Sequence, residues 1–320
     1  MIYFITWFIL FCFTIYFDFL SNYQKQQKII AKYFVLILLI IIAGLRYRLA
    51  PDTVAYQWFF NDLTPNLYDF FTHDFSTSQA SYQYTWVLLN SFFYTFFDYY
   101  TFQFFLSFLS IYLLYKTSII FTKNTLLFFY LLFCTIYFYY TMEVVRQFLA
   151  LSIVLYSIQF YLSKRKIKAI ILLIIALFIH RFAFIILPFY FIILINYKLR
   201  SKFIFLLLLF ILFYFIHAYI VNYSGFELTY FTFDFLAYKG VLFNIGLSII
   251  LILFMFLYRN YPTSFFNGYK NILYSGLIVY LFLMLFKLTI NPFFERTLDY
   301  FIPFVLFFIQ LYYLIFLNIV

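Results

Sequence analysis

The stretch KYFVLILLIIIAGLR, residues 32–46, contains only uncharged residues between Lys32 and Arg46. Runs of this kind recur along the 320 residues, of which 67% are hydrophobic and only 10% are charged. A helix that crosses the hydrocarbon core of a membrane needs roughly 20 mostly apolar residues, whereas no soluble globular domain has this composition. We therefore expect an integral membrane protein surrounded by membrane lipid.

The apolar runs predict an all-α polytopic fold with about eleven transmembrane helices. These spans are expected near residues 1–20, 32–46, 100–117, 124–142, 144–162, 167–180, 182–196, 202–220, 239–257, 271–288 and 299–318. The first run lacks the basic start of a signal peptide, so we expect it to remain as a span. No repeat or low-complexity linker divides the chain, and residues 1–320 are expected to form one transmembrane domain.

Charge orients the predicted spans, because lysine and arginine collect in the cytoplasmic loops of membrane proteins. Five connections without acidic residues hold 14 of the 21 basic residues: Lys25, Lys28 and Lys32; Lys116 and Lys123; Lys164, Arg165, Lys166 and Lys168; Lys198, Arg200 and Lys202; Arg259 and Lys270. Every acidic residue except Asp18 lies in the alternate connections. We therefore expect the N-terminus outside and the C-terminus inside. The net charge of +10 mostly reflects this sorting, and no nucleic-acid partner is expected.

The segment 82–98 is apolar enough to resemble a span, but counting it as one would place the basic residues 164–168 outside. We therefore expect a re-entrant or surface helix on the outer face. It belongs to an extended outer segment, residues 46–99.

Seven basic residues lie outside the basic loops, on the face where sorting alone would place none: Arg46, Arg48, Arg146, Arg181, Lys239, Lys287 and Arg296. Five of the seven are arginines, whose planar fork suits bidentate binding of phosphate or carboxylate. An anionic ligand on the outer side is the natural inference. The alternative for each residue is an interfacial side chain that reaches toward water, which is the preferred interpretation for Lys239 and Lys287.

Four places in the sequence combine these arginines with groups that can accept or donate a proton. Arg46 and Arg48 precede Asp52. Arg146 and Gln147 follow Glu143 at the start of a predicted span. The alternative to a functional role is a Glu143–Arg146 ion pair that stabilises this end of the helix. His180, beside Arg181, ends another span, and Arg296 lies between Glu295 and Asp299. A structural histidine and a local ion-pair network are the respective alternatives at these last two places. No metal-ligand motif is present, and we expect neither a metal nor a cofactor.

Five motifs in this order resemble the EpsG-like family of bacterial polysaccharide polymerases, related in role to the O-antigen polymerase Wzy. They are LRYRLAPDTVAY (45–56), EVVRQFLALSI (143–153), KRKIK (164–168), ALFIHRFAFIILPFYF (176–191) and FERTLDYF (294–301). The chain departs from the family pattern at Ala50-Pro51, where the family usually has a glycine before the aspartate. It departs again at Glu143, where asparagine is usual.

The resemblance implies a metal-independent membrane glycosyltransferase of the bacterial cytoplasmic membrane. Such an enzyme joins polyprenyl-diphosphate-linked oligosaccharide repeat units into a capsule, O-antigen or exopolysaccharide at the outer face, alongside a flippase and a chain-length regulator. A diphosphate leaving group needs fixed positive charge, and a sugar hydroxyl needs a base. The binding candidates are Arg46, Arg48, Arg146, Gln147, Arg181 and Arg296, and the candidate bases are Asp52, Glu143 and His180.

Three other functions fit parts of the pattern. A flippase for lipid-linked sugars would also need cations, but it would more typically show repeated halves and helices broken by glycine or proline. A transferase that modifies the glycan is the closer rival, although an acyltransferase would want a nucleophile near His180. A purely structural membrane partner would leave the outer arginines unexplained.

Overall fold

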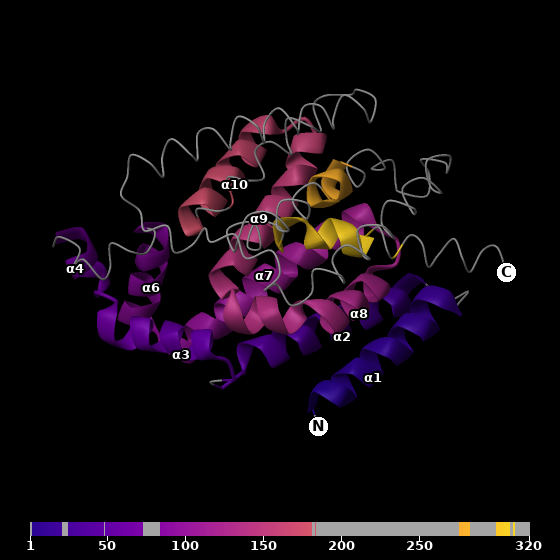
Figure 1. Ribbon diagram of the computed structural model, residues 1–320, viewed down its shortest axis with the longest axis horizontal. Coiled ribbons are helices and arrows are strands. Elements are labelled where there is room, and N and C mark those ends of the chain that lie inside the picture. The colour runs from indigo at the N-terminus through magenta and orange to yellow at the C-terminus, as the bar shows by residue number, and fades with distance from the viewer. Residues whose placement is uncertain are drawn as a thin grey trace, which may run out of the picture. The chain divides into compact units, whose positions relative to one another are not determined.

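The computed structural model describes residues 2–20, 25–47, 49–72, 84–180, 183, 275–281, 299–307 and 310. The chain divides into two compact units, Met1–Phe184 and Ile185–Val320, and most of the described residues belong to the first. Every regular element among the described residues is a helix (Figure 1), which confirms the all-α part of the predicted fold. The predicted spans 182–196, 202–220 and 239–257 fall outside the described residues apart from Ala183. The single domain 1–320 stays a prediction.

Within the described part of the first unit, the chain forms α-helices and three π-helical turns. The α-helices are α1 (Ile2–Thr14), α2 (Lys25–Gly44), α3 (Pro51–Trp58), α4 (Leu67–Thr72), α6 (Tyr84–Phe96), α7 (Tyr99–Phe121), α8 (Thr125–Thr135), α9 (Val145–Leu162) and α10 (Lys166–Ile179). The π-helical turns are η1 (Ile15–Phe19), η2 (Phe59–Leu63) and η3 (Tyr139–Glu143). In the second unit, the described residues include a helical stretch at 275–281 and the short helix η7 (Asp299–Phe301), which is followed by an α-helical stretch at 302–307.

Four described helical segments are long and apolar enough to cross a membrane: Ile2–Phe19, Gln26–Gly44, Tyr99–Phe121 and Val145–Leu162. They coincide with four of the predicted spans and identify an integral membrane protein. The total of eleven spans stays a prediction, because much of the second unit is outside the described residues.

Helix α6 corresponds to the segment predicted to be a re-entrant or surface helix. Its 13 residues extend for about 20 Å at 1.5 Å per residue, which is less than the roughly 30 Å of a bilayer core. It packs against α4, α7 and α10 instead. The helix itself is therefore confirmed, and its location at the outer face stays a prediction.

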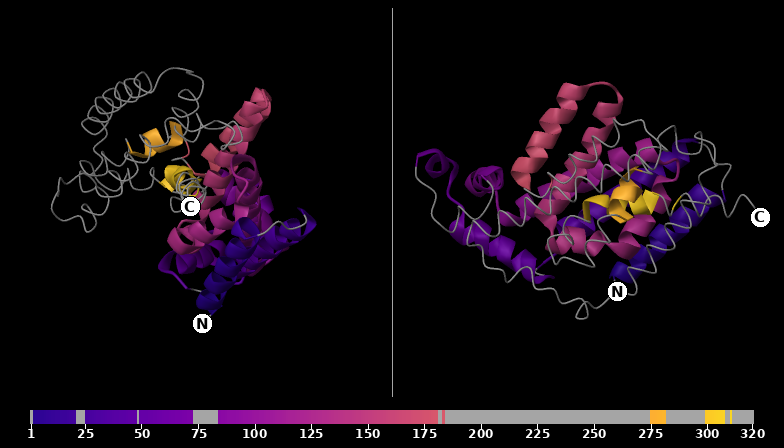
Figure 2. Two further views of the ribbon diagram at one scale, coloured as in Figure 1. Left: turned by 90° about the vertical axis from the view of Figure 1, so that its right-hand side faces the viewer. Right: turned by 45° about the horizontal axis from the view of Figure 1, so that its top comes forward.

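Successive long helices of the first unit run in alternating directions, so their connections gather at two ends. Helix α2 packs against α7, α7 packs against α9, and α9 and α10 form an antiparallel hairpin (Figure 2). One end, which we call the arginine end, holds the C-terminus of α2, the N-termini of α7 and α9, and the C-terminus of α10. The opposite end holds the basic connections at 116–123 and 163–168.

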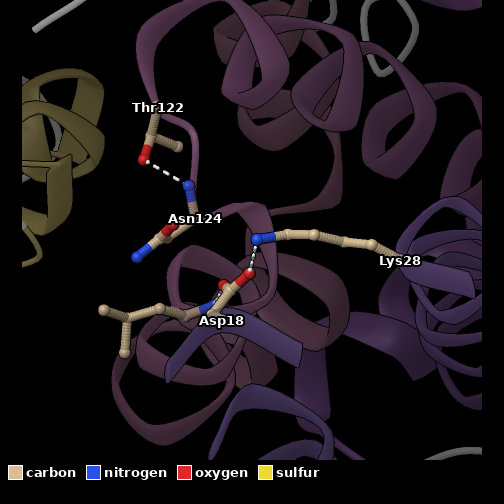
Figure 3. A network of polar contacts seen from close by, with 5 residues as sticks. Asp18, Lys28, Thr122 and Asn124 are labelled. Atoms are coloured by element: carbon tan, nitrogen blue, oxygen red, sulfur yellow. Dashed lines mark hydrogen bonds and ion pairs between the residues drawn. The ribbon is translucent and has the colours of Figure 1, made fainter. Parts of the chain in front are cut away.

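Asp18, the acidic residue that departs from the charge sorting, lies at this opposite end. Its carboxylate is fully buried and lies 2.8 Å from the ammonium nitrogen of Lys28, which is 30% exposed. The main-chain N–H of Leu127 donates to the other carboxylate oxygen at 3.0 Å (Figure 3). Asp18 thus joins η1, α2 and α8. In the sequence it is the one acidic residue near a basic connection, and a lysine of that connection, Lys28, is its partner.

Candidate functional site

The arginine end brings together six of the nine residues that are predicted from the sequence to form the site. Arg46 follows α2, Asp52 opens α3, Glu143 ends η3, Arg146 lies in the first turn of α9, and His180 follows α10. Gln147 follows Arg146 in α9, whereas Arg48, Arg181 and Arg296 lie outside the described residues.

Arg46 is buried at the junction of α2 and α7, with 4% of its surface exposed. Its Nη1 donates to the carbonyl of Ala43, near the end of α2, and to Oγ of Ser107 at 3.3 Å. Its Nε has no hydrogen-bond partner among the described residues. Burial lowers the pKa of Arg46 to about 10, so the side chain stays cationic at neutral pH. The sequence predicts Arg46 as a contact for an anion, and that role stays a prediction. In the structure its side chain caps the end of α2 and joins α2 to α7.

The start of α7 fixes the main chain on either side of Arg46. Gln103 Nε2 donates to the carbonyls of Gly44 and Arg46, both at 2.8 Å. Asp98 caps α7 by accepting from the Thr101 N–H at 2.8 Å, and its hydrogen bonds with Thr101 lower the pKa of Asp98 below its ordinary value. Sequence reasoning missed Gln103. The available signal was a polar pair, Gln103 and Ser107, spaced four residues apart on one face of an apolar helix.

Asp52 and Glu143 lie on two segments that are joined by hydrogen bonds of the adjacent residues, Thr53 and Met142. The Thr53 hydroxyl donates to the Met142 carbonyl at 2.9 Å, and the Tyr99 hydroxyl donates to the Thr53 carbonyl at 3.2 Å. Both carboxylate residues are exposed. An acidic residue is favoured in the first turn of a helix such as α3. The arrangement leaves two solvent-accessible carboxylates on adjoining elements.

The ion pair between Glu143 and Arg146 that the sequence offered as an alternative is not formed. Among the described residues Glu143 makes no ion pair. The reason lies in the backbone, because Val144, with φ −107° and ψ 43°, separates η3 from α9. Glu143 and Arg146 therefore do not share a continuous helical face. π-Helical turns such as η3 are frequent at functional sites.

Arg146 lies over an aromatic side chain from a different helix. Its guanidinium carbon is 5.8 Å from the ring centre of Trp86 on α6. Trp86 is 1% exposed, and Tyr56 of α3 meets it edge-on at 5.9 Å. Arg146 itself is only partly buried. Trp86 was not nominated from sequence, because one tryptophan among many aromatic residues carries no distinguishing pattern.

Two other candidate residues at this end are buried. Gln147 is 2% exposed within α9, and His180 is 4% exposed. Only Ser163, Lys164 and Arg165 separate α9 from α10. In an antiparallel hairpin, residues at equal distances from the turn lie side by side, so His180 lies level with Phe148. Phe148 is two residues beyond Arg146, which corresponds to about 3 Å along the helix axis at 1.5 Å per residue. The hairpin therefore brings the histidine to the same end of the unit as the arginine.

The comparisons with curated proteins and with solved structures gave no match. The model of the EpsG family matches residues 29–319, which covers nearly the whole chain and both units. The matched region includes all nine nominated site residues. The chain therefore belongs to the EpsG family, whose members are polysaccharide polymerase-type membrane proteins.

Proposed function

We propose that this protein joins polyprenyl-diphosphate-linked oligosaccharide repeat units into a surface polysaccharide, by glycosyl transfer at the outer face of the bacterial cytoplasmic membrane. The observation that carries the proposal is the arrangement at the arginine end. There, the partly exposed cation of Arg146 lies at the same end of the unit as two exposed carboxylates and a histidine.

In the proposed reaction, a hydroxyl of the acceptor sugar attacks the anomeric carbon of the donor glycan. The bond from that carbon to the diphosphate oxygen breaks, and the polyprenyl diphosphate leaves with the bonding electrons. A base on the protein takes the proton of the hydroxyl. The site must therefore stabilise growing negative charge on the leaving diphosphate and hold a basic group on the acceptor side.

Arg146 is the main candidate for the diphosphate contact, because it is cationic and accessible at the start of a helix, where N–H groups also favour anions. Arg46 is buried and occupied by Ala43 and Ser107, so its contribution is a fixed positive charge behind the site. Arg48, Arg181 and Arg296 remain proposed contacts, and Gln147 remains a proposed partner from inside α9. Guanidinium groups can supply this charge without a metal ion.

Asp52, Glu143 and His180 remain the three candidates for the base. The exposure of Asp52 and Glu143 allows either carboxylate to reach a substrate hydroxyl. His180 is buried and would need an approach along the α9–α10 hairpin. The proposed topology places the N-terminus and the arginine end outside and the C-terminus inside, with a flippase and a chain-length regulator as partners. The separation of lysine-rich connections from the arginine end supports this orientation.

The surface glycan of a strain that lacks the protein tests the proposal. Loss of long chains with retention of one capped repeat unit is the expected result for a polymerase. Accumulation of the unit on the inner leaflet would indicate a flippase instead, and full-length chains that lack one decoration would indicate a modifying transferase. Complementation with Arg146→Lys should insert normally but fail to restore long chains, because an ammonium cannot reproduce bidentate geometry. Lys123→Arg, at the opposite end, is the matched control and should restore them.

A further inference from the structure

Trp86 has a polar group that its packing does not satisfy. The side chain is 1% exposed, and its indole N–H has no hydrogen-bond partner among the described residues. A buried N–H without an acceptor costs folding free energy, and such groups in native structures call for a specific explanation. Phenylalanine at this position would keep an aromatic ring without the unsatisfied donor. The indole is therefore poorly explained by stability alone.

The ring of Trp86 lies where four helices of the first unit meet. Tyr56 of α3 contacts it edge-on at 5.9 Å, and Phe102 of α7 lies at 5.6 Å. Arg146 of α9 lies over it at 5.8 Å, and the tryptophan itself belongs to α6. The two aromatic neighbours hold the indole in place, and the indole in turn offers a fixed surface to the cation.

A cation over an aromatic face is attracted by the ring quadrupole, and indole is the strongest of the aromatic side chains in this role. A guanidinium held over a ring keeps its N–H donors in its own plane for other partners. Such a contact reduces the freedom of a long arginine side chain before any ligand arrives, which lowers the entropic cost of binding.

We infer that Trp86 is a positioning residue, which orients the Arg146 guanidinium for the diphosphate of the lipid-linked substrate. The inference rests on the proposed function, since it assigns Trp86 a role in that same site. It also gives the segment 46–99 a part in catalysis, because α3 and α6 of this segment supply Tyr56 and Trp86.

The test compares Trp86→Phe and Trp86→Leu in the full-length protein in detergent. Two quantities are measured: the unfolding temperature, and the affinity for radiolabelled farnesyl diphosphate, a short polyprenyl diphosphate. Trp86→Phe removes the unsatisfied N–H, so it should unfold at or above the wild-type temperature, yet bind about three- to tenfold more weakly. Trp86→Leu should bind more weakly still. Trp7→Phe is the matched control, because Trp7 contacts Phe4, Phe11 and Tyr130 in a separate aromatic cluster.

A second measurement separates positioning from general packing. In an Arg146→Gln background the cation is absent, so adding Trp86→Phe should cause no further loss of affinity. An equal loss in both backgrounds would overturn the inference, as would wild-type affinity in Trp86→Phe alone. A wild-type protein that binds farnesol as well as farnesyl diphosphate would overturn the proposed function together with the inference. Diphosphate binding that is insensitive to Trp86 would overturn the inference alone.

Discussion

The hydroxyl group of Thr53 donates a hydrogen bond to the main-chain carbonyl of Met142 at 2.9 Å, across a sequence separation of 89 residues. Asp52 directly precedes Thr53, and Glu143 directly follows Met142. One buried contact thereby fixes the two segments that carry the exposed carboxylates of the candidate site. It also joins α3, in the predicted outer segment, to the turn that leads into α9.

Replacing Thr53 by valine tests whether this contact matters to function. Valine has nearly the same shape but leaves the Met142 carbonyl unsatisfied in a buried place, which should cost about 1–3 kcal/mol. In a strain whose only copy of the protein carries Thr53→Val, we expect shorter polysaccharide chains on the cell surface. Thr53→Ser keeps the hydroxyl and should restore long chains. Equal chain lengths from the two variants would show that the contact is dispensable.

Gly44 allows the close approach of α2 and α7 on which Arg46 and Gln103 depend. A Cβ at this position would lie 2.5 Å from the Phe104 side chain and 3.2 Å from its Cα. The ring could turn aside, but the main chain of α7 would also have to move. We expect Gly44→Ala to lower the free energy of unfolding by about 1–3 kcal/mol, as overpacking usually does. Thermal unfolding in detergent measures this change, and Leu45→Ala, at an exposed neighbour, should leave it nearly unaltered.

Burial at Arg46 predicts a pH effect that only a lysine variant would reveal. The pKa of Arg46 falls to about 10 because burial penalises its charge. Lysine begins about two units lower, so the same burial would bring its pKa toward neutrality. Between the folded and unfolded pKa values the unfolded state binds more protons, and stability rises with pH. Arg46→Lys should therefore be destabilised at pH 7 and partly recover by pH 9.5.

The measurement is the unfolding temperature at several pH values, taken relative to the wild type under the same conditions. In the wild type this site should contribute no pH dependence between pH 7 and 9, because its arginine remains protonated there. A constant difference between Arg46→Lys and wild type across this range would mean that the lysine escapes burial and reaches water.

The fold of the first unit could be predicted well where apolar length and charge decide it. The span predicted near 32–46 corresponds to α2, but this helix begins earlier, at Lys25, and ends at Gly44. The earlier start gives it the length that a membrane span needs. The hydropathy pattern did not predict the interruption near residue 136, where the predicted span 124–142 is divided into α8 and η3. Hydropathy cannot distinguish these forms, because an α-helix and a π-helical turn bury equally apolar residues.

The candidate site could be predicted as a set of residues but not as an arrangement. Charge sorting nominated Arg46 and Arg146 equally, yet the structure buries the first in a helix cap and leaves the second partly exposed over Trp86. The difference arises from contacts between helices far apart in sequence. Side chains such as Gln103 and Trp86 acquire their roles only through those contacts, so no local pattern marks them.

The ion pair between Asp18 and Lys28 at the opposite end predicts an asymmetry between its two members. Lys28→Met would remove the cation that contacts the fully buried carboxylate of Asp18 and would leave only the attraction of Lys32. Breaking a buried pair by removing one partner costs up to about 3–5 kcal/mol. Asp18→Asn keeps an oxygen for the N–H of Leu127, and the 30% exposed Lys28 can turn toward water. We therefore expect the lysine variant to unfold at a much lower temperature than the asparagine variant.

Combining the two changes tests the cause of this asymmetry. If the cost of Lys28→Met comes from the stranded carboxylate, then adding Asp18→Asn removes that charge and should recover most of the lost unfolding temperature. Lys123→Met, an exposed lysine at the same end, controls for the general loss of positive charge and should have little effect. A double variant no more stable than Lys28→Met would contradict this cause, because removing the charge of Asp18 would then bring no gain.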